Sequence, residues 1–273
     1  MPSSSSQPWP VKQYTPRHQT WPYNPSDFTR QDSTPDAAFY SVPRFVTHID
    51  DAAIATLAAY YDAVLPKKGK ILDFCSSWVS HYPPSLEQAA ARGEVQITGM
   101  GMVQAELDAN EVLNHGRLLQ DLNEDADLHA ALVRHGCLPT TDDSPDSGKL
   151  DASTNVVSTD YLTQPVAVLR SLRKATKPGG TVHLIVSNRC FPTKAISRWL
   201  RASEGERLEM VGDFLFFAGW KKIEIVELSN GMTETEEGSG ASGAAQGGFQ
   251  GLMGMLGMMN RRDPLWAVRA VKE

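Results

Sequence analysis

Cysteine is scarce in this sequence, and no apolar run approaches the length of a membrane span. The three cysteines, Cys75, Cys137 and Cys190, are far apart and lack CxxC or Cys/His spacing, so we expect neither a disulfide framework nor a metal site. A transmembrane helix needs about 18 or more consecutive apolar residues, and the N-terminus has no basic segment followed by an apolar core. We therefore predict no stable membrane insertion, no secretion and a reducing, cytoplasmic location. Residues 1–26 contain no acidic residue and weakly resemble a transit peptide, which leaves organellar targeting as an alternative.

Positive charge is also in short supply. The formal net charge is -6 and the isoelectric point is near 5.7, which argues against a protein that binds nucleic acid through its phosphates. Small molecules or proteins are the better partners, and the oligomeric state is not indicated. With 273 residues, 41% of them hydrophobic, the chain is large enough to bury one sizeable core.

Proline and glycine divide the chain. Residues 1–38 are so rich in proline that we predict an extended or disordered arm without regular structure. Its aromatic residues are unusual for pure disorder, so we expect the arm to lie on the domain surface. Residues 39–273 form the predicted domain, interrupted by a flexible insertion at 231–260 that is rich in Gly, Ser and Met.

Strand and helix patterns alternate from residue 50 onward, which predicts a doubly wound α/β domain with a mostly parallel sheet. A helix carrying Ile54, Leu57 and Tyr61 is stopped by Pro66. We expect Asn123 to cap a later helix and residues 177–180 to form a tight turn. The predicted strands are 70–74, 95–98, 117–119, 150–158, 181–187, 222–228 and 265–271.

The loop that follows the first predicted strand has no glycine. Lys70 to Phe74 is an apolar run ending in Asp73, and it delivers small residues to the carboxyl edge of the sheet, where doubly wound folds bind ligands. Glycines usually let the backbone of such a loop approach a nucleotide cofactor. Here Cys75, Ser77 and Val79 occupy those positions.

Over residues 50–272 the chain resembles the class I S-adenosylmethionine-dependent methyltransferases, on the segments 71–74, 150–158 and 172–182. Segments 76–83, 99–102 and 187–196 look like a poorly characterised branch of methyltransferase-like proteins from plants, algae and fungi. The resemblance implies a seven-stranded sheet whose last strand is antiparallel, S-adenosylmethionine as the cofactor and a small-molecule substrate. It implies cofactor contacts from Asp73, Cys75, Ser76, Ser77, Trp78, Gly99, Met100, Gly101, Met102, Asp121, Leu122, Asn155 and Val156.

Two departures from the family pattern affect this expectation. The loop glycines are absent, and Gly101 stands where the family places the acidic residue that binds both ribose hydroxyls. Losing a charged acceptor removes hydrogen bonds of about 1.5 to 3 kcal/mol each. Asp73 either orients the cofactor or caps its own turn, and the loop serines Ser76, Ser77 and Ser80 either donate to a ligand carboxylate or simply form the turn.

Several side chains near the strand ends are candidates for acceptor chemistry. His81 and Asp160 are the candidate bases, against the alternatives of a structural histidine and a turn residue. Arg189 either pairs with a substrate anion or forms a salt bridge at the rim, and Cys190 is expected to pack. Residues 39–50, which precede the first helix, are expected either to form a lid over the cofactor or to pack against the domain. The candidate substrate contacts are Tyr161, Asn188, Arg189, Arg44 and His48.

The sequence therefore predicts methyl transfer from S-adenosylmethionine to a small acceptor, with most of the catalysis arising from positioning. A catalytically inactive binding or scaffold protein with a degenerate cofactor loop is the alternative, favoured by the missing glycines and by Gly101. A nicotinamide-dependent oxidoreductase is disfavoured because no GxGxxG follows the first strand.

Overall fold

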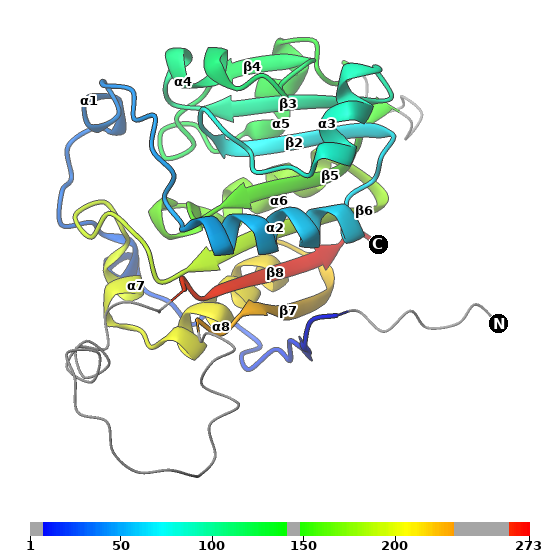
Figure 1. Cartoon of the computed structure of the whole chain (residues 1–273). Helices are drawn as coiled ribbons and strands as arrows, with labels where there is room; N and C mark the ends of the chain where they lie inside the picture. Colours follow the sequence, from blue (N-terminus) through cyan, green and yellow to red (C-terminus); the bar gives the residue numbers. More distant parts are fainter. Residues whose placement is uncertain (1–7, 141–147, 232–261) are drawn as a thin grey trace, which may run out of the picture.

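The computed structural model describes residues 8–140, 148–231 and 262–273. One eight-stranded sheet runs through the molecule in the order β1-β7-β8-β6-β5-β2-β3-β4 (Figure 1). Five strands, β2 to β6, are mutually parallel, whereas β8 is antiparallel to both β6 and β7. The strands are β1 Val11–Gln13, β2 Gly69–Ser76, β3 Val95–Gly101, β4 Gly116–Leu119, β5 Leu150–Val156, β6 Thr176–Ser187, β7 Lys221–Ser229 and β8 Leu265–Val271.

This order confirms the predicted α/β fold with its antiparallel last strand, and adds one strand to the expected seven. Crossover connections link the parallel strands, and helices cover both faces of the sheet (Figure 1). No helix in the described parts of the chain combines the length and apolarity needed to cross a membrane. The α-helices are α1 Asp36–Phe39, α2 Asp51–Val64, α3 Pro84–Ala91, α4 Gln104–Ala109, α5 Leu128–Arg134, α6 Pro165–Ala175, α7 Ser197–Arg201 and α8 Glu204–Phe217.

Two hydrophobic cores lie on opposite faces of the sheet. Neighbouring residues of β2 separate between them, because successive side chains of a strand point to opposite faces. Ile71 joins the core built with α2 and α3, whereas Leu72 joins the core built with α5, α6 and α8. Both side chains are fully buried. Burial on both faces accounts for the continuous apolar runs of the central strands.

The N-terminal arm contains regular structure, so the prediction that its prolines exclude such structure is wrong. β1 pairs antiparallel with β7 at the edge of the sheet, where Pro10 and Pro16 flank the strand without interrupting a central ladder. A 3-10 helix, Pro25–Phe28, and α1 follow. Buried Asp213 of α8 accepts hydrogen bonds from Tyr14 and, at 2.5 Å, Tyr23. These contacts hold the arm against the domain.

Two local predictions need correction. Asp127, not Asn123, caps α5, because its carboxylate accepts the amide of Ala130 at 3.0 Å. The expected turn at 177–180 lies within β6, where the register shifts between Leu150 and Ala152 of the neighbouring strand. The predicted flexible insertion at 231–260 lies outside the described residues except for Gly231.

Candidate active site

A cavity of about 340 Å³ opens at the carboxyl edge of the parallel strands. Its wall combines residues that follow β2, β3, β4, β5 and β6 with the segment that joins α1 to α2. In Figure 1 this segment passes along the same edge of the sheet. Ligand sites in open α/β sheets occupy this edge, and the volume lies at the lower end of the range of small-molecule pockets, about 300 to 1,000 Å³.

The loop after β2 turns sharply without glycine. Cys75 adopts a left-handed backbone conformation with φ of 54°, which glycine adopts without steric cost and other residues rarely do. The strand resumes at Ser76, which pairs with Gly101 of β3 beyond a register shift. The first position of the missing glycines thus retains the backbone geometry that glycine would supply, while Ser77 and Val79 contribute side chains to the cavity wall.

Asp73 organises this loop through its carboxylate. It accepts the hydroxyls of Ser76 and Ser80, each at 2.7 Å, and of Thr154 at 3.2 Å. Burial raises the pKa of Asp73 to about 6, and the three hydroxyl hydrogen bonds oppose that shift. Because each serine hydroxyl has one hydrogen, Ser76 and Ser80 donate to Asp73 and not to a ligand. Ser77 remains the loop serine whose hydroxyl can face a ligand.

Gly101 leaves no room for the acidic residue that the family pattern places there. A Cβ added to Gly101 would lie 2.2 Å from the carbonyl oxygen of Ser76 and 3.3 Å from the side chain of Leu107. Glu106, on α4, supplies a nearby carboxylate instead. It is 8% exposed, lines the cavity and accepts the backbone amide of Arg44 at 2.7 Å.

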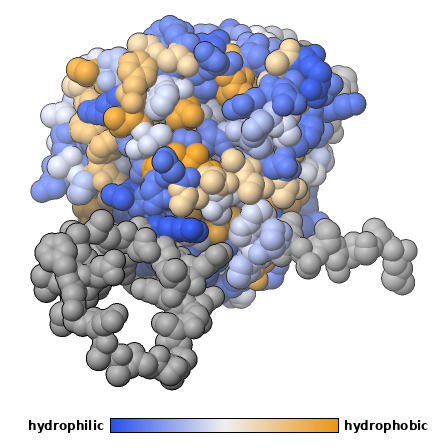
Figure 2. Space-filling view, viewed as in Figure 1, coloured by the Kyte–Doolittle hydropathy of each residue, from blue (hydrophilic) through white to orange (hydrophobic). Residues whose placement is uncertain are grey.

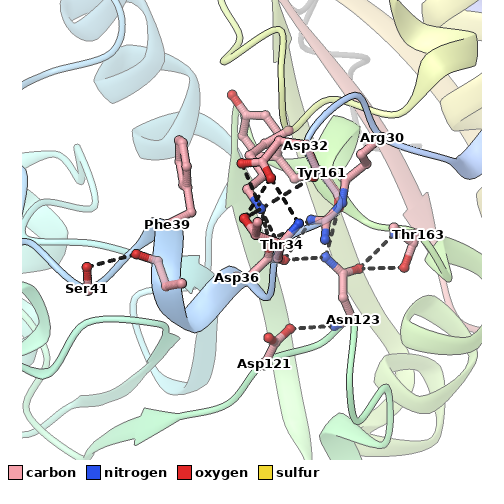
Figure 3. A network of polar contacts seen from close by, with 12 residues as sticks. Arg30, Asp32, Thr34, Asp36, Phe39, Ser41, Asp121, Asn123, Tyr161 and Thr163 are labelled. Carbon is pink, nitrogen blue, oxygen red and sulfur yellow. Dashed lines mark hydrogen bonds and ion pairs between the residues drawn. The ribbon is translucent and has the colours of Figure 1, made fainter.

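The end of the cavity beside β4 is joined to the N-terminal arm by a polar network (Figure 3). Asp121 and Leu122 line the cavity as predicted, and so does Asn123. The amide of Asn123 donates to Asp36 at 2.8 Å and accepts the amide of Thr163 at 2.8 Å. Arg30 donates to both oxygens of Asp36, at 2.7 and 2.8 Å. This network, which sequence reasoning missed, positions α1 beside the cavity.

The segment after β5 departs from the prediction at two residues. Val156, Val157 and Ser158 line the cavity, but Asn155 does not. The Asn155 amide is buried and donates to the carbonyl of Phe74 at 3.0 Å. Asp160, also buried, lies outside the cavity wall, and its Oδ2 has no hydrogen-bond partner in the described part of the protein. Burial raises the pKa of Asp160 to about 8, so near neutral pH it holds a proton, and its role as a base stays a prediction.

The two histidines of the cavity are neutral near pH 7. Burial lowers the pKa of His81 to about 4, and repulsion from His48 when that side chain is protonated adds a smaller contribution in the same direction. Burial also lowers the pKa of His48. His81 lines the cavity with a left-handed backbone, φ 55°. An imidazole of this kind accepts a hydrogen bond from an acceptor nucleophile and is a weak general base.

The candidate substrate contacts separate into different environments. Arg44, His48, Tyr161 and Arg189 line the cavity, whereas Asn188 does not. Arg189 donates through Nε to Asp263 at 2.7 Å, and its side chain is 61% exposed. The hydroxyl of Tyr161 accepts the backbone amide of Phe191 at 2.7 Å. Cys190, expected to pack, also faces the cavity.

Trp78 lies beside the cavity without filling it. Its indole donates to the carbonyl of Val46 at 3.1 Å, and its ring meets Phe45 edge-on, 6.2 Å between centroids. Among the predicted cofactor residues, Trp78, Gly99 and Met100 are absent from the cavity wall, whereas Gly101 and Met102 are present. Apart from Cys190, the lining residues that sequence reasoning gave no site role are chiefly Asp36, Glu106, Gln120, Asn123 and Phe191. These residues share one feature in the sequence, which is a position after a strand or before α2. Many residues outside the cavity have such a position too, so this feature alone could not identify the lining residues.

The matches of this chain to known proteins are all to solved structures, and their similarity is low. No protein-family model matches the chain, and no curated protein matches it in sequence. Solved structures do match. An S-adenosylmethionine-dependent methyltransferase from Archaeoglobus fulgidus is 12% identical, with TM-score 0.48, over 80% of this chain and 94% of that chain. A methyltransferase from Mesorhizobium loti is 15% identical, with TM-score 0.44, over 79% and 97%.

A third match is phosphoethanolamine N-methyltransferase 2 from Haemonchus contortus, solved with S-adenosylmethionine. It is 16% identical, with TM-score 0.44, over 80% of this chain and 52% of that chain. This chain therefore spans about half of the Haemonchus protein.

Within the described ranges, no group of three or more His, Cys, Asp or Glu side chains is arranged to hold a metal ion.

Proposed function

We propose that this protein binds S-adenosylmethionine and transfers its methyl group to a small-molecule acceptor. The observation that carries the proposal is the cavity at the carboxyl edge of the sheet, bordered by a loop that keeps a left-handed turn at Cys75. The strand order and the antiparallel β8 support the same reading. When bound, the cofactor supplies an activated methyl group.

The residues of the cavity fit this cofactor. Asp121 and Leu122 would border adenine, Glu106 would accept from the ribose hydroxyls in place of a side chain at Gly101, and Ser77 would face the methionine part. Val156, Val157 and Ser158 would line the side of methyl transfer. This chain's own contribution is then mainly orientation and exclusion of water, which accounts for much of the catalysis in displacements of this kind. Neutral His81 would accept a proton from an acceptor that must lose one.

The second candidate is a binding or scaffold protein that has lost the methyl donor. Two observations favour it: Ser77 and Val79 bring side chains to the wall that glycines would leave bare, and Gly101 cannot carry an acid. Neither observation closes the cavity, because its volume remains about 340 Å³ and Trp78 lies outside its wall.

Calorimetric titration of the full chain with S-adenosylmethionine and S-adenosylhomocysteine separates the two candidates, with NADPH as a third titrant. We expect saturable binding of both adenosyl compounds and none of NADPH. E106Q should weaken binding of S-adenosylhomocysteine by about tenfold, corresponding to a charged hydrogen bond of about 1.5 kcal/mol. The matched control is E87Q, on α3, because Glu87 is exposed and lies outside the cavity wall. Absence of heat with both adenosyl compounds would refute the enzymatic proposal.

A further inference from the structure

Arg44 is a cation of the cavity wall with an unused donor. Its Nη2 donates to the carbonyl of Phe39 at 3.0 Å. Its Nη1 is buried and has no hydrogen-bond partner, and no carboxylate lies within ion-pair distance of the guanidinium, in the part of the chain that the structure describes. A buried donor of this kind costs free energy until a partner reaches it.

The other cations near the cavity already have carboxylate partners. Arg30 binds Asp36, and Lys194, which is fully buried, lies 3.3 Å from both Asp32 and Asp36. Arg189 binds Asp263. A bound anion would have to displace these partners, whereas at Arg44 it would have no carboxylate to displace.

Aromatic rings hold the guanidinium of Arg44 in place. Its central carbon lies 4.6 Å from the ring centroid of Phe39, 5.8 Å from that of Tyr40 and 5.6 Å from that of Phe191. The preceding backbone is restricted by Pro43, and the Arg44 amide is fixed by Glu106 at 2.7 Å. A rigid guanidinium loses little entropy on binding, which favours planar recognition of carboxylate or phosphate.

The rings also place Arg44 at the end of the cavity formed after β5 and β6. Phe191 follows β6, and its ring lies 6.1 Å from that of Tyr161, which follows β5. Tyr40, Tyr161 and Phe191 all line the cavity. Phe45 and Val46, which follow Arg44 in the chain, are 53% and 55% exposed, and Figure 2 shows hydrophobic residues interspersed with hydrophilic ones over the face that it presents. The surroundings of Arg44 suit an apolar body attached to a charged group.

We propose that Arg44 binds a carboxylate or phosphate group of the methyl acceptor, so that the acceptor is a small anionic molecule with an apolar body. The inference rests on the proposed function, because it assigns this end of the cavity to the acceptor. The same chemistry is present in the carboxylate of the methyl donor, and the experiment must distinguish the two sources.

Titration of the full chain saturated with S-adenosylhomocysteine tests the proposal, with benzoate and phenyl phosphate as anionic probes and benzyl alcohol as the neutral one. We expect at least one anion to bind more tightly than benzyl alcohol. R44Q should weaken that binding at least about tenfold, which is about 1.4 kcal/mol, and leave benzyl alcohol unchanged. The matched control is R134Q, on α5, because the side chain of Arg134 is 59% exposed and lies outside the cavity wall. If R44Q does not fold, R44K replaces it, and an affinity for phenyl phosphate several-fold weaker than that of the native chain is expected because the planar fork is lost.

Binding of S-adenosylhomocysteine and of 5′-methylthioadenosine, which lacks the amino-acid part, identifies the source of the anion. If R44Q weakens the first and not the second, Arg44 binds the donor's carboxylate and the inference is overturned. It is also overturned if neither anion binds the native chain, or if R44Q or R44K binds both as tightly. If the native chain binds no S-adenosylhomocysteine, the proposed function fails, and the substrate assignment fails with it. Titration of the anions alone then shows separately whether the Arg44 site exists.

Discussion

A side chain at position 101 should destabilise the protein even though the family pattern has one there. The Cβ of alanine would approach the Ser76 carbonyl oxygen to 2.2 Å, about 1 Å closer than ordinary C···O contacts of about 3.3 Å. β2 and β3 would have to separate at the point where Ser76 pairs with Gly101. Overpacking costs about 1 to 3 kcal/mol, and a weakened strand hydrogen bond adds about 1 kcal/mol. We therefore expect G101A to lower the free energy of unfolding by about 2 to 4 kcal/mol.

Urea denaturation followed by circular dichroism measures this change. The matched control is G205A, because Gly205 lies in the first turn of α8 and a Cβ there meets nothing within 4 Å. That variant should be stabilised by about 0.4 to 1 kcal/mol through the lower entropy of its unfolded chain. Equal stability of G101A and the native chain would refute the steric argument.

The same position tests how the cavity binds ribose. G101D restores the acidic residue of the family pattern, but it must displace the Ser76 carbonyl, so we expect weaker binding of S-adenosylhomocysteine than in the native chain. Calorimetry at a temperature where G101D remains folded gives the answer. Tighter binding by G101D would show that Glu106 does not replace the missing acid.

Three further predictions concern the loop, a buried carboxyl and the arm. Because Cys75 has φ 54°, C75G should stay within about 1 kcal/mol of native stability, whereas C75V should lose about 1 to 3 kcal/mol because a β-branched residue is strained there. Denaturant titration compares the stabilities of the two variants, and equal values would contradict backbone strain at this position. The folded-state pKa of Asp160 is raised to about 8, so the folded protein retains the proton that the unfolded chain releases, and stability should fall by up to about 1.4 kcal/mol per pH unit between pH 4 and 8. D160N should make the free energy of unfolding less dependent on pH, whereas D108N, at an exposed site, should not. Unfolding curves at several pH values test this prediction, and parallel profiles for the native chain and D160N would contradict it. D36L should lower the free energy of unfolding by about 3 to 5 kcal/mol, because it leaves Arg30 and fully buried Lys194 without a shared carboxylate. The loss should exceed that of D32L, since Asp32 is 29% exposed. Equal melting temperatures for D36L and D32L would contradict a stabilising role of this network.

The regular part of the fold was predictable because hydrophobic spacing determines it. The five parallel strands, β2 to β6, lie where the sequence pattern predicts strands. β1 could not be predicted, because a strand of three residues flanked by prolines is too short to show a hydrophobic period. Its pairing with β7 also depends on the sheet edge that is left available once the rest of the domain has folded. The cap of α5 was assigned to the wrong residue because Asn123 and Asp127 both carry side chains suited to capping.

The candidate site was predictable only as a set of loops. Topology placed Cys75, Asp121 and Val156 at one edge of the sheet, and all three line the cavity. The direction of each side chain was beyond reach: Asn155 points away to the Phe74 carbonyl and Asp160 lies behind the wall. Asp36 belongs to the site through Asn123, a contact between residues 87 positions apart, which no local pattern reports.

Backbone strain concentrates where the cavity is. Four non-glycine residues in the described ranges have positive φ, and three of them, Cys75, His81 and Val157, line the cavity. Val157, with φ 42°, is β-branched, and such a conformation costs about 1 to 3 kcal/mol. A glycine at any of these positions would relieve the strain but would remove a side chain from the wall. These loops therefore keep side chains in the cavity wall at the expense of stability. Strained residues concentrated around one cavity are expected of a ligand site, and not of a sheet edge that serves packing alone.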